Sequence, residues 1–182
     1  MIPTRAPLWL HRYLSWEQSL MRLSNRIHDR RYWRTFFAAC SRLGDGVGWY
    51  VLTALVVLIH GLSALPPMLW MLASALVAVG IYVAIKRLTA RPRPMHAHSG
   101  IHHSVAPLDQ YSFPSGHTLH AVNFTVQLVA FVPELAWLLV PFALAIAASR
   151  LVLGLHYFSD VLVGAALGGA IAYATLYLQS VF

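Results

Sequence analysis

Residues 149–160 read SRLVLGLHYFSD and place Arg150, His156 and Asp160 among apolar side chains. Charged groups are costly in an apolar environment unless they are paired or hold a ligand. This stretch therefore indicates a buried polar site at the end of an apolar segment, and the rest of the sequence has to supply its partners.

The composition points to an integral membrane protein. Of the 182 residues, 58% are hydrophobic and 10% are charged, and the mean hydropathy is +0.61. An ordinary soluble domain is far less apolar. We expect bilayer lipids around this chain and no nucleic acid partner. We see no removable signal peptide, and the single cysteine, Cys40, excludes an internal disulfide.

Five apolar runs are each close to the length of about 20 residues that crosses a bilayer core. They span residues 47–63, 67–86, 116–132, 135–153 and 159–178. A polar loop rich in proline and histidine, residues 87–115, separates the second run from the third. The predicted fold is an all-α bundle of about five transmembrane helices, with residues 47–182 forming one membrane-embedded domain.

Residues 1–46 have a different pattern. Apolar residues recur near helical spacing among arginines, at Leu14, Leu20, Leu23 and Ile27. This pattern favours a basic amphipathic helix that lies at the membrane interface, as a segment of its own. The alternative is a solvated basic tail.

Alternating spans bring distant charges to one membrane face, because each pair of consecutive spans returns the chain there. The side chains that meet are Lys86, Arg93, His117, Arg150, His156 and Asp160. Three of them are permanent cations with little acid nearby, and such a cluster calls for a multiply charged anion. Arginine suits phosphate oxygens. Ser115 and Gly116, at the start of the third span, offer a hydroxyl and free backbone N–H groups to the same anion.

The two histidines add reactivity to this predicted phosphate pocket. His156 and Asp160 are four residues apart, so that the carboxylate can accept a ring proton and orient the other nitrogen outward. His156 is therefore a candidate nucleophile, and His117 can protonate a departing oxygen. These residues describe phosphoryl transfer through a phosphohistidine, with no cofactor and no metal required.

Three motifs in this order resemble the signature of the type-2 phosphatidic acid phosphatase family, whose superfamily includes vanadium haloperoxidases and glucose-6-phosphatase. They are Lys86-x6-Arg93-Pro94, Pro114-Ser115-Gly116-His117 and Ser149-Arg150-x5-His156-x3-Asp160. The resemblance covers residues 86–160, and the span pattern extends it to about residue 180. Residues 1–46 do not contribute to it.

The resemblance implies a role for each matched residue. Lys86, Arg93 and Arg150 would bind the phosphate, and Ser115 and Gly116 would add hydrogen bonds. His156 would attack phosphorus, Asp160 would orient it, and His117 would act as general acid and then as base. Membrane members of the family act on lipid phosphates and diphosphates such as phosphatidic acid, phosphatidylglycerophosphate, undecaprenyl diphosphate or lipid A.

The sequence departs from the family in its number of spans. Membrane members usually have six spans and a site on the outer face, whereas we count five here. All 13 Lys and Arg residues, eight of them in residues 1–46 from Arg5 to Arg42, then fall on the face of the site. The positive-inside rule favours a cytoplasmic site in a bacterial inner membrane.

Several features have competing interpretations. The loop histidines His96, His98, His102 and His103 lack regular metal-ligand spacing, so we favour a polar or headgroup-facing loop over zinc. Gly164 and Gly168 could form a dimer face, but we favour close packing inside the chain. His120, Asn123 and Gln127 share one helix face and are expected to line the bundle interior.

Two alternative functions would use the same predicted phosphate pocket. A lipid-phosphate carrier or flippase would bind the headgroup without chemistry, and a vanadate-dependent haloperoxidase would hold vanadate there. The histidines and the orienting acid argue against a carrier, because binding alone needs only the cations. The apolar spans argue against a haloperoxidase.

Overall fold

The computed structural model describes residues 7–182 and is helical in almost all of them apart from one long loop. The predicted all-α class is therefore confirmed. The elements are α1 (Leu8–Asn25), η1 (Arg26–Asp29), α2 (Arg31–Leu43), α3 (Val47–His60), η2 (Gly61–Ala64), α4 (Leu65–Thr89), α5 (Pro94–Ala97), α6 (Gly116–Phe131), η3 (Pro133–Leu135), α7 (Ala136–Val152) and α8 (Phe158–Val181).

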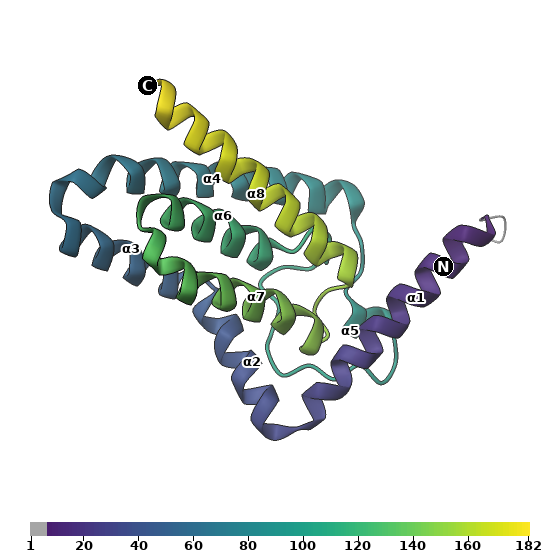
Figure 1. Cartoon of the computed structure of the whole chain (residues 1–182). Coiled ribbons are helices and arrows are strands. Elements are labelled where there is room, and N and C mark those ends of the chain that lie inside the picture. Colours follow the sequence, from purple (N-terminus) through teal and green to yellow (C-terminus); the bar gives the residue numbers. More distant parts are fainter. Residues whose placement is uncertain (1–6) are drawn as a thin grey trace.

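Each of the five predicted spans contains a helix. Not every one of these helices is long and apolar enough to cross a membrane. Three helical stretches of the described chain are long and apolar enough: Val47–Thr89, Pro133–Val152 and Phe158–Val181. The first one folds back at η2, where Gly61 has a φ of +70°, so that α3 and α4 form a hairpin (Figure 1). Helix α6 has only 16 residues and packs against α4, α7 and α8.

Helix α6 is therefore the centre of the bundle, and its polar face is satisfied inside the protein. Gln127 Nε2 and Asn123 Nδ2 donate to Ser74 Oγ of α4 at 2.9 and 3.1 Å. The expectation that these side chains line the interior is confirmed. Around them lies an apolar core in which Trp49 stacks on Phe124 with ring centroids 5.2 Å apart.

Gly164 and Gly168 allow α8 to approach α6 closely. A Cβ atom on either glycine would lie less than 3.0 Å from a backbone oxygen of α6 or its cap, that of Ser115 or of Leu119. Both glycines are buried. Close packing inside the chain, the interpretation we favoured, is thus what the structure shows for this pair.

The N-terminal segment is folded against the bundle, so the solvated-tail alternative is wrong for its described part. Helices α1 and α2 form a V beside α7 (Figure 1). Glu17 is only 1% exposed and accepts hydrogen bonds from Arg91 Nη2 at 2.6 Å and from the Ser159 backbone N–H at 3.0 Å. Asn25 Nδ2 donates to the carbonyls of Val152 and His102 at 2.9 and 2.7 Å.

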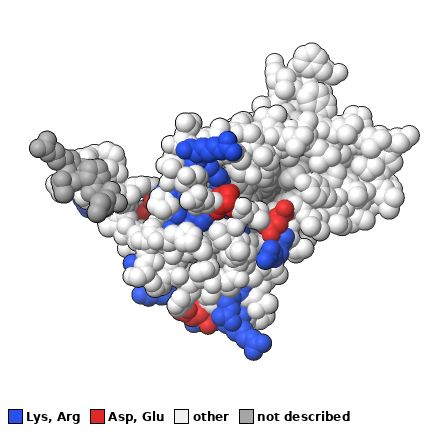
Figure 2. Space-filling model, turned by 180° about the vertical axis from the view of Figure 1, so that it is seen from behind, with Lys and Arg blue, Asp and Glu red and all other residues white. Residues whose placement is uncertain are grey.

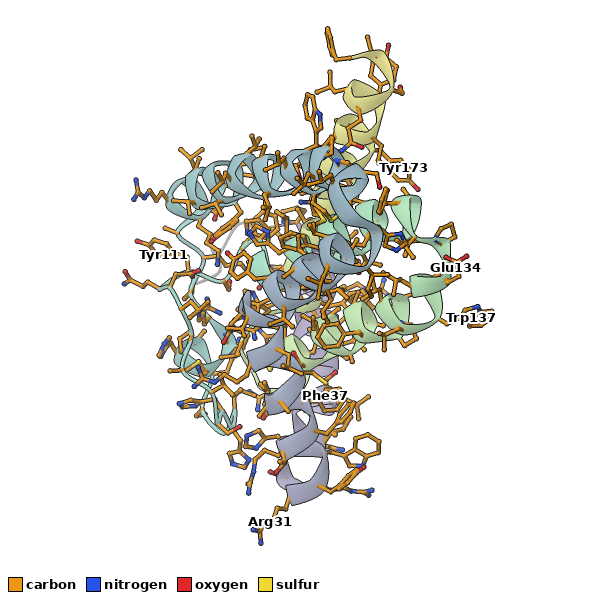
Figure 3. The ribbon with its side chains drawn as sticks, turned by 90° about the vertical axis from the view of Figure 1, so that its left-hand side faces the viewer. Arg31, Phe37, Tyr111, Glu134, Trp137 and Tyr173 are labelled. Atoms are coloured by element: carbon orange, nitrogen blue, oxygen red, sulfur yellow. The ribbon has the colours of Figure 1, made fainter. Side chains whose placement is uncertain are left out.

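Most of the charged side chains in view lie over one part of the surface. In Figure 2 the blue and red patches are scattered among white atoms over the middle and lower parts of the molecule, while its right-hand part is white. In Figure 3, Arg31 at the start of α2 lies on the opposite side of the molecule from Tyr173 on α8. Arg5 lies outside the described residues.

Candidate active site

A cavity of about 170 Å³ lies where the last turn of α4, the first turn of α6 and the last turn of α7 meet. Its polar and charged lining includes Asp45, Lys86, Arg93, Asp109, His117, His120, Arg150 and His156. Gly116 also lines it. Residues of all three motifs therefore meet at one cavity, which holds most of the predicted site residues.

His156 forms one wall of this cavity and is 1% exposed. Between the end of α7 and His156 the backbone turns at Gly154, which has a φ of +66°. Arg93 Nη1 lies 3.1 Å from His156 Nε2. Because a guanidinium can only donate, Nε2 must be the accepting, unprotonated nitrogen, and the proton of the neutral ring is on Nδ1.

The charge state of His156 agrees with this assignment. Burial lowers the pKa of His156 well below its ordinary value, and the cations Arg93, Arg150 and Lys86 lower it further. The ring is thus neutral at pH 7. Its Nδ1 lies 3.4 Å from Asp160 Oδ2, a close approach in which no hydrogen bond is formed.

Asp160 lies behind the cavity and is fully buried. Its Oδ2 accepts the Tyr157 backbone N–H at 2.8 Å, so that it caps the start of α8. Its Oδ1 accepts Arg91 Nη1 at 2.7 Å, and the Arg91 guanidinium lies 4.0 Å from the centre of the Tyr157 ring. Asp160, which faces His156, thus belongs to a buried ion-pair network that continues through Arg91 to Glu17 on α1.

Two of the three predicted phosphate-binding cations share a carboxylate that sequence reasoning missed. Lys86 Nζ and Arg93 Nη2 both donate to Asp109 Oδ1, at 2.9 and 2.8 Å. Burial raises the pKa of Asp109, but the hydrogen bonds and charges of Lys86 and Arg93 outweigh it and hold this pKa below the ordinary value. The expectation of little acid near the cations is therefore wrong, because Asp109 and Asp45 come from segments that carry no motif.

Arg150 is buried at 2% exposure and reaches back to the N-terminal segment. Its Nη1 donates to Ser41 Oγ on α2. Its Nε has no hydrogen-bond partner among the described residues. The guanidinium therefore retains donor capacity beside the cavity that protein groups do not use.

The second motif is divided between the cavity and the helix cap. His117 lines the cavity, and its Nε2 donates to Asp45 Oδ1 from the junction of α2 and α3. Ser115 is not in the lining: its Oγ lies 3.0 Å from Thr118 Oγ1 and caps α6, while its backbone N–H donates to the Asp160 carbonyl at 2.9 Å.

The loop histidines lie outside the cavity lining. Tyr157 Oη and His98 Nε2 are 3.0 Å apart, and His102 Nδ1 donates to Asp29 at 2.7 Å. One possible metal-ligand group occurs in the part of the chain that the structure describes, formed by His28, Asp29 and His102. Asp29 and His102 are exposed and already paired with each other, so the loop is fastened to the N-terminal segment through them.

The chain matches known proteins in sequence. A family model described as the PAP2 superfamily matches residues 67–181. Decaprenylphosphoryl-5-phosphoribose phosphatase of Mycobacterium tuberculosis is 38% identical over 131 residues, which cover 69% of this chain and 68% of that protein.

Solved structures share the fold. The crystal structure of Aquifex aeolicus LpxE has a TM-score of 0.76 at 24% identity, covering 87% of this chain and 93% of that one. The first transmembrane PAP2 type phosphatidylglycerolphosphate phosphatase from Bacillus subtilis has a TM-score of 0.75 at 20% identity, covering 92% of this chain and 86% of that one. With the three motifs assembled around one cavity and a family match over more than half its length, the chain belongs to the PAP2 superfamily.

Proposed function

We propose that this protein is an integral-membrane lipid phosphatase that hydrolyses a phosphate monoester or diphosphate of a lipid through a phosphohistidine at His156. One observation carries most of the proposal. A neutral, buried His156 presents an unprotonated Nε2 next to Arg93 at the wall of a cavity lined by cations. Nucleophilic catalysis needs this protonation state, and a binding site alone does not.

In the proposed reaction the Nε2–P bond forms as the bond between phosphorus and the lipid oxygen breaks. His117 gives a proton to that oxygen, while Lys86, Arg93 and Arg150 stabilise the charge that develops on the phosphoryl oxygens. Asp160 orients the ring of His156 and stabilises its positive charge. Gly116, at the start of α6, donates its backbone N–H to the phosphoryl oxygens, and the Ser115 side chain caps the same helix.

Water completes the cycle. It attacks phosphorus, His117 now accepts its proton, and the Nε2–P bond breaks to release phosphate and neutral His156. No step requires a metal ion, so we expect activity without one. A carrier would need only the cations, and the presence of the whole His and Asp arrangement favours hydrolysis over that alternative.

An apolar groove beside the cavity supports a lipid substrate. The groove, of about 530 Å³, is lined by α3 and α4 residues such as Val57, Leu58 and Leu72. Tyr50 lines both the groove and the polar cavity. A phosphate in the cavity would thus place its hydrocarbon chain between α3 and α4, facing the bilayer.

We further propose that α1 and α2 rest at the membrane interface on the site face. Both helices expose aromatic side chains among their arginines, including Trp9 and Trp16 on α1 and Trp33 on α2. Tryptophan is enriched at membrane interfaces, and arginines on one face favour the cytoplasmic side. Substrates made on that side, such as phosphatidylglycerophosphate or new undecaprenyl diphosphate, follow from this placement.

The test is phosphate release by the purified protein in detergent, with and without EDTA. The panel consists of phosphatidic acid, phosphatidylglycerophosphate, undecaprenyl diphosphate, decaprenylphosphoryl-5-phosphoribose and lipid A. We expect release from at least one lipid that survives EDTA and falls to background in His156→Ala. His60→Ala is the matched control, because His60 is an exposed histidine outside the cavity. Full activity in His156→Ala contradicts the mechanism, and binding without release by folded protein favours the carrier.

A further inference from the structure

The cavity contains a second histidine and aspartate pair, and its acid comes from outside the three motifs. Asp45 lies between α2 and α3 and accepts the Nε2 proton of His117, 72 residues further along the chain. The two side chains are 20% and 10% exposed. Because a carboxylate only accepts, Nε2 of His117 carries a proton.

The junction that carries Asp45 is constrained by two glycines and by backbone hydrogen bonds. Gly46 has a φ of +126°, which favours glycine, and a Cβ on Gly44 would lie 3.0 Å from Ile146 of α7. The Asp45 backbone N–H donates to the Arg42 carbonyl at 3.1 Å. One turn earlier, Ser41 accepts the hydrogen bond from Arg150. The N-terminal segment therefore presents Asp45 to the cavity as a fixed group.

The pairing leaves one nitrogen of His117 for the substrate. Its Nδ1 makes no hydrogen bond to any described residue, while the ring lines the cavity. Burial raises the pKa of Asp45, but the hydrogen bond and charge of His117, then Arg150 and Arg42, outweigh it and hold this pKa below the ordinary value. Asp45 is therefore a carboxylate at pH 7, and its charge favours the protonated form of His117.

We infer that Asp45 is the positioning residue of the general acid His117, so that the N-terminal segment completes the active site. Asp45 fixes the ring with Nδ1 toward the leaving oxygen and favours the imidazolium that gives its proton to that oxygen. This inference rests on the proposed phosphatase function. Burial of the His117 ring opposes Asp45 most strongly, and the charges of Arg150 and Arg93 also disfavour a charge on that ring. The rings of His120 and His156 line the same cavity.

The test compares Asp45→Asn with wild type on the most rapidly hydrolysed lipid of the panel above. Asparagine keeps the size of the side chain but removes its charge. We expect kcat/KM at pH 7 to fall about 100-fold, a typical contribution of general acid catalysis. We also expect the alkaline limb of kcat/KM against pH to move to lower pH, because His117 loses the negative charge that favours its protonated form. Asp45→Glu should restore part of both.

Arg42→Gln is the matched control. Arg42 is 65% exposed and lies 3.7 Å from Asp45 Oδ2, so this variant removes the other ion pair of Asp45 and leaves His117 paired. We expect wild-type activity and an unshifted pH profile.

The position of the pH limb does not depend on how much protein is folded, so a partly folded Asp45→Asn sample still gives an answer. A lower rate with an unmoved alkaline limb, or wild-type behaviour, overturns the positioning role. Arg42→Gln with the same loss also overturns it. Wild-type protein that releases no phosphate, or His156→Ala that remains active, instead contradicts the proposed function and not this inference alone.

Discussion

The two histidine and aspartate pairs at the cavity differ in how the chain brings them together. His156 and Asp160 are four residues apart at the start of α8, whereas His117 and Asp45 are 72 apart and come from different segments. Local spacing is enough to identify the first pair, and only the fold identifies the second. The difference teaches that a motif defines the centre of this site, while its supporting charges come from segments that the motif does not reach.

The local pair should respond most strongly to loss of charge. Asp160→Asn removes the group that faces His156 Nδ1, and we expect kcat/KM to fall about 10³- to 10⁴-fold, as when a histidine loses its orienting carboxylate in a triad. The measurement is steady-state phosphate release at pH 7. The control is Asp29→Asn, an exposed aspartate with a histidine partner outside the cavity. A loss of less than tenfold would mean that Asp160 serves α8 capping and Arg91 rather than His156.

A change in the ion pair between Arg91 and Glu17 tests how far the His156 and Asp160 pair depends on the N-terminal segment. Glu17→Gln leaves Arg91 without one of its two carboxylate partners. We expect a loss of about 3 kcal/mol in the free energy of unfolding, because removing one carboxylate of a buried ion-pair network leaves the Arg91 charge only partly compensated by Asp160. This corresponds to a thermal midpoint lower by about 6–12 °C for a chain of this size, measured in detergent.

Glu134→Gln is the control for Glu17→Gln. Glu134 lies in the turn between α6 and α7, at the other end of α6 from the cavity. Its side chain is exposed. We expect an unchanged midpoint. Equal stability of both variants would show that α1 is not anchored through Glu17.

The contact between α6 and α8 keeps the two pairs at a fixed separation, because His117 lies on α6 and Asp160 on α8. Gly168→Ala would place a methyl group against the Leu119 backbone. We expect a cost of about 1–3 kcal/mol from overpacking, seen as a lower thermal midpoint. In Gly169→Ala the new methyl group meets only Val122 at 3.9 Å, and we expect no loss. Similar effects at both glycines would contradict the packing described here.

The smallest effect is expected at Asp109, which belongs to neither pair. Its carboxylate accepts from Lys86 and Arg93, the same donors that would bind phosphate. Asp109→Asn should therefore strengthen inhibition by vanadate about two- to fivefold, since the side chain is 39% exposed and its attraction is partly screened. Weaker inhibition would mean that Asp109 holds the two cations in place instead of competing for them.

What could be predicted from the sequence differs in the same way between features set by neighbouring residues and contacts between distant segments. The helices and the cluster around His156 were predictable because hydrophobic runs and motif spacing are local signals. Ser115 was assigned to the phosphate, yet its hydroxyl caps α6, because spacing does not say where a side chain points. Residues 1–46 were expected to lie at the interface on the site face without contributing to the motifs, but their Ser41 and Asp45 reach Arg150 and His117.

One feature of the sequence could have drawn attention to the acidic residues that pair with the site. The chain has only six acidic residues against 13 Lys and Arg, and acid is scarce enough that each carboxylate needs an explanation. Four of the six bond to site residues or to Arg91: Glu17, Asp45, Asp109 and Asp160. Pairing them still required the fold, since no periodicity links position 17 or 45 to the motifs.

The most direct test of the central claim is to trap the phosphoenzyme. Protein is mixed with a lipid of the panel labelled with ³²P in the phosphoryl group that is released, quenched in alkali after milliseconds, and digested for peptide mapping. We predict a label that is stable in alkali, lost in acid, located on His156 and absent from His156→Ala. Turnover without any trapped label, or a label that persists in His156→Ala, would contradict the account.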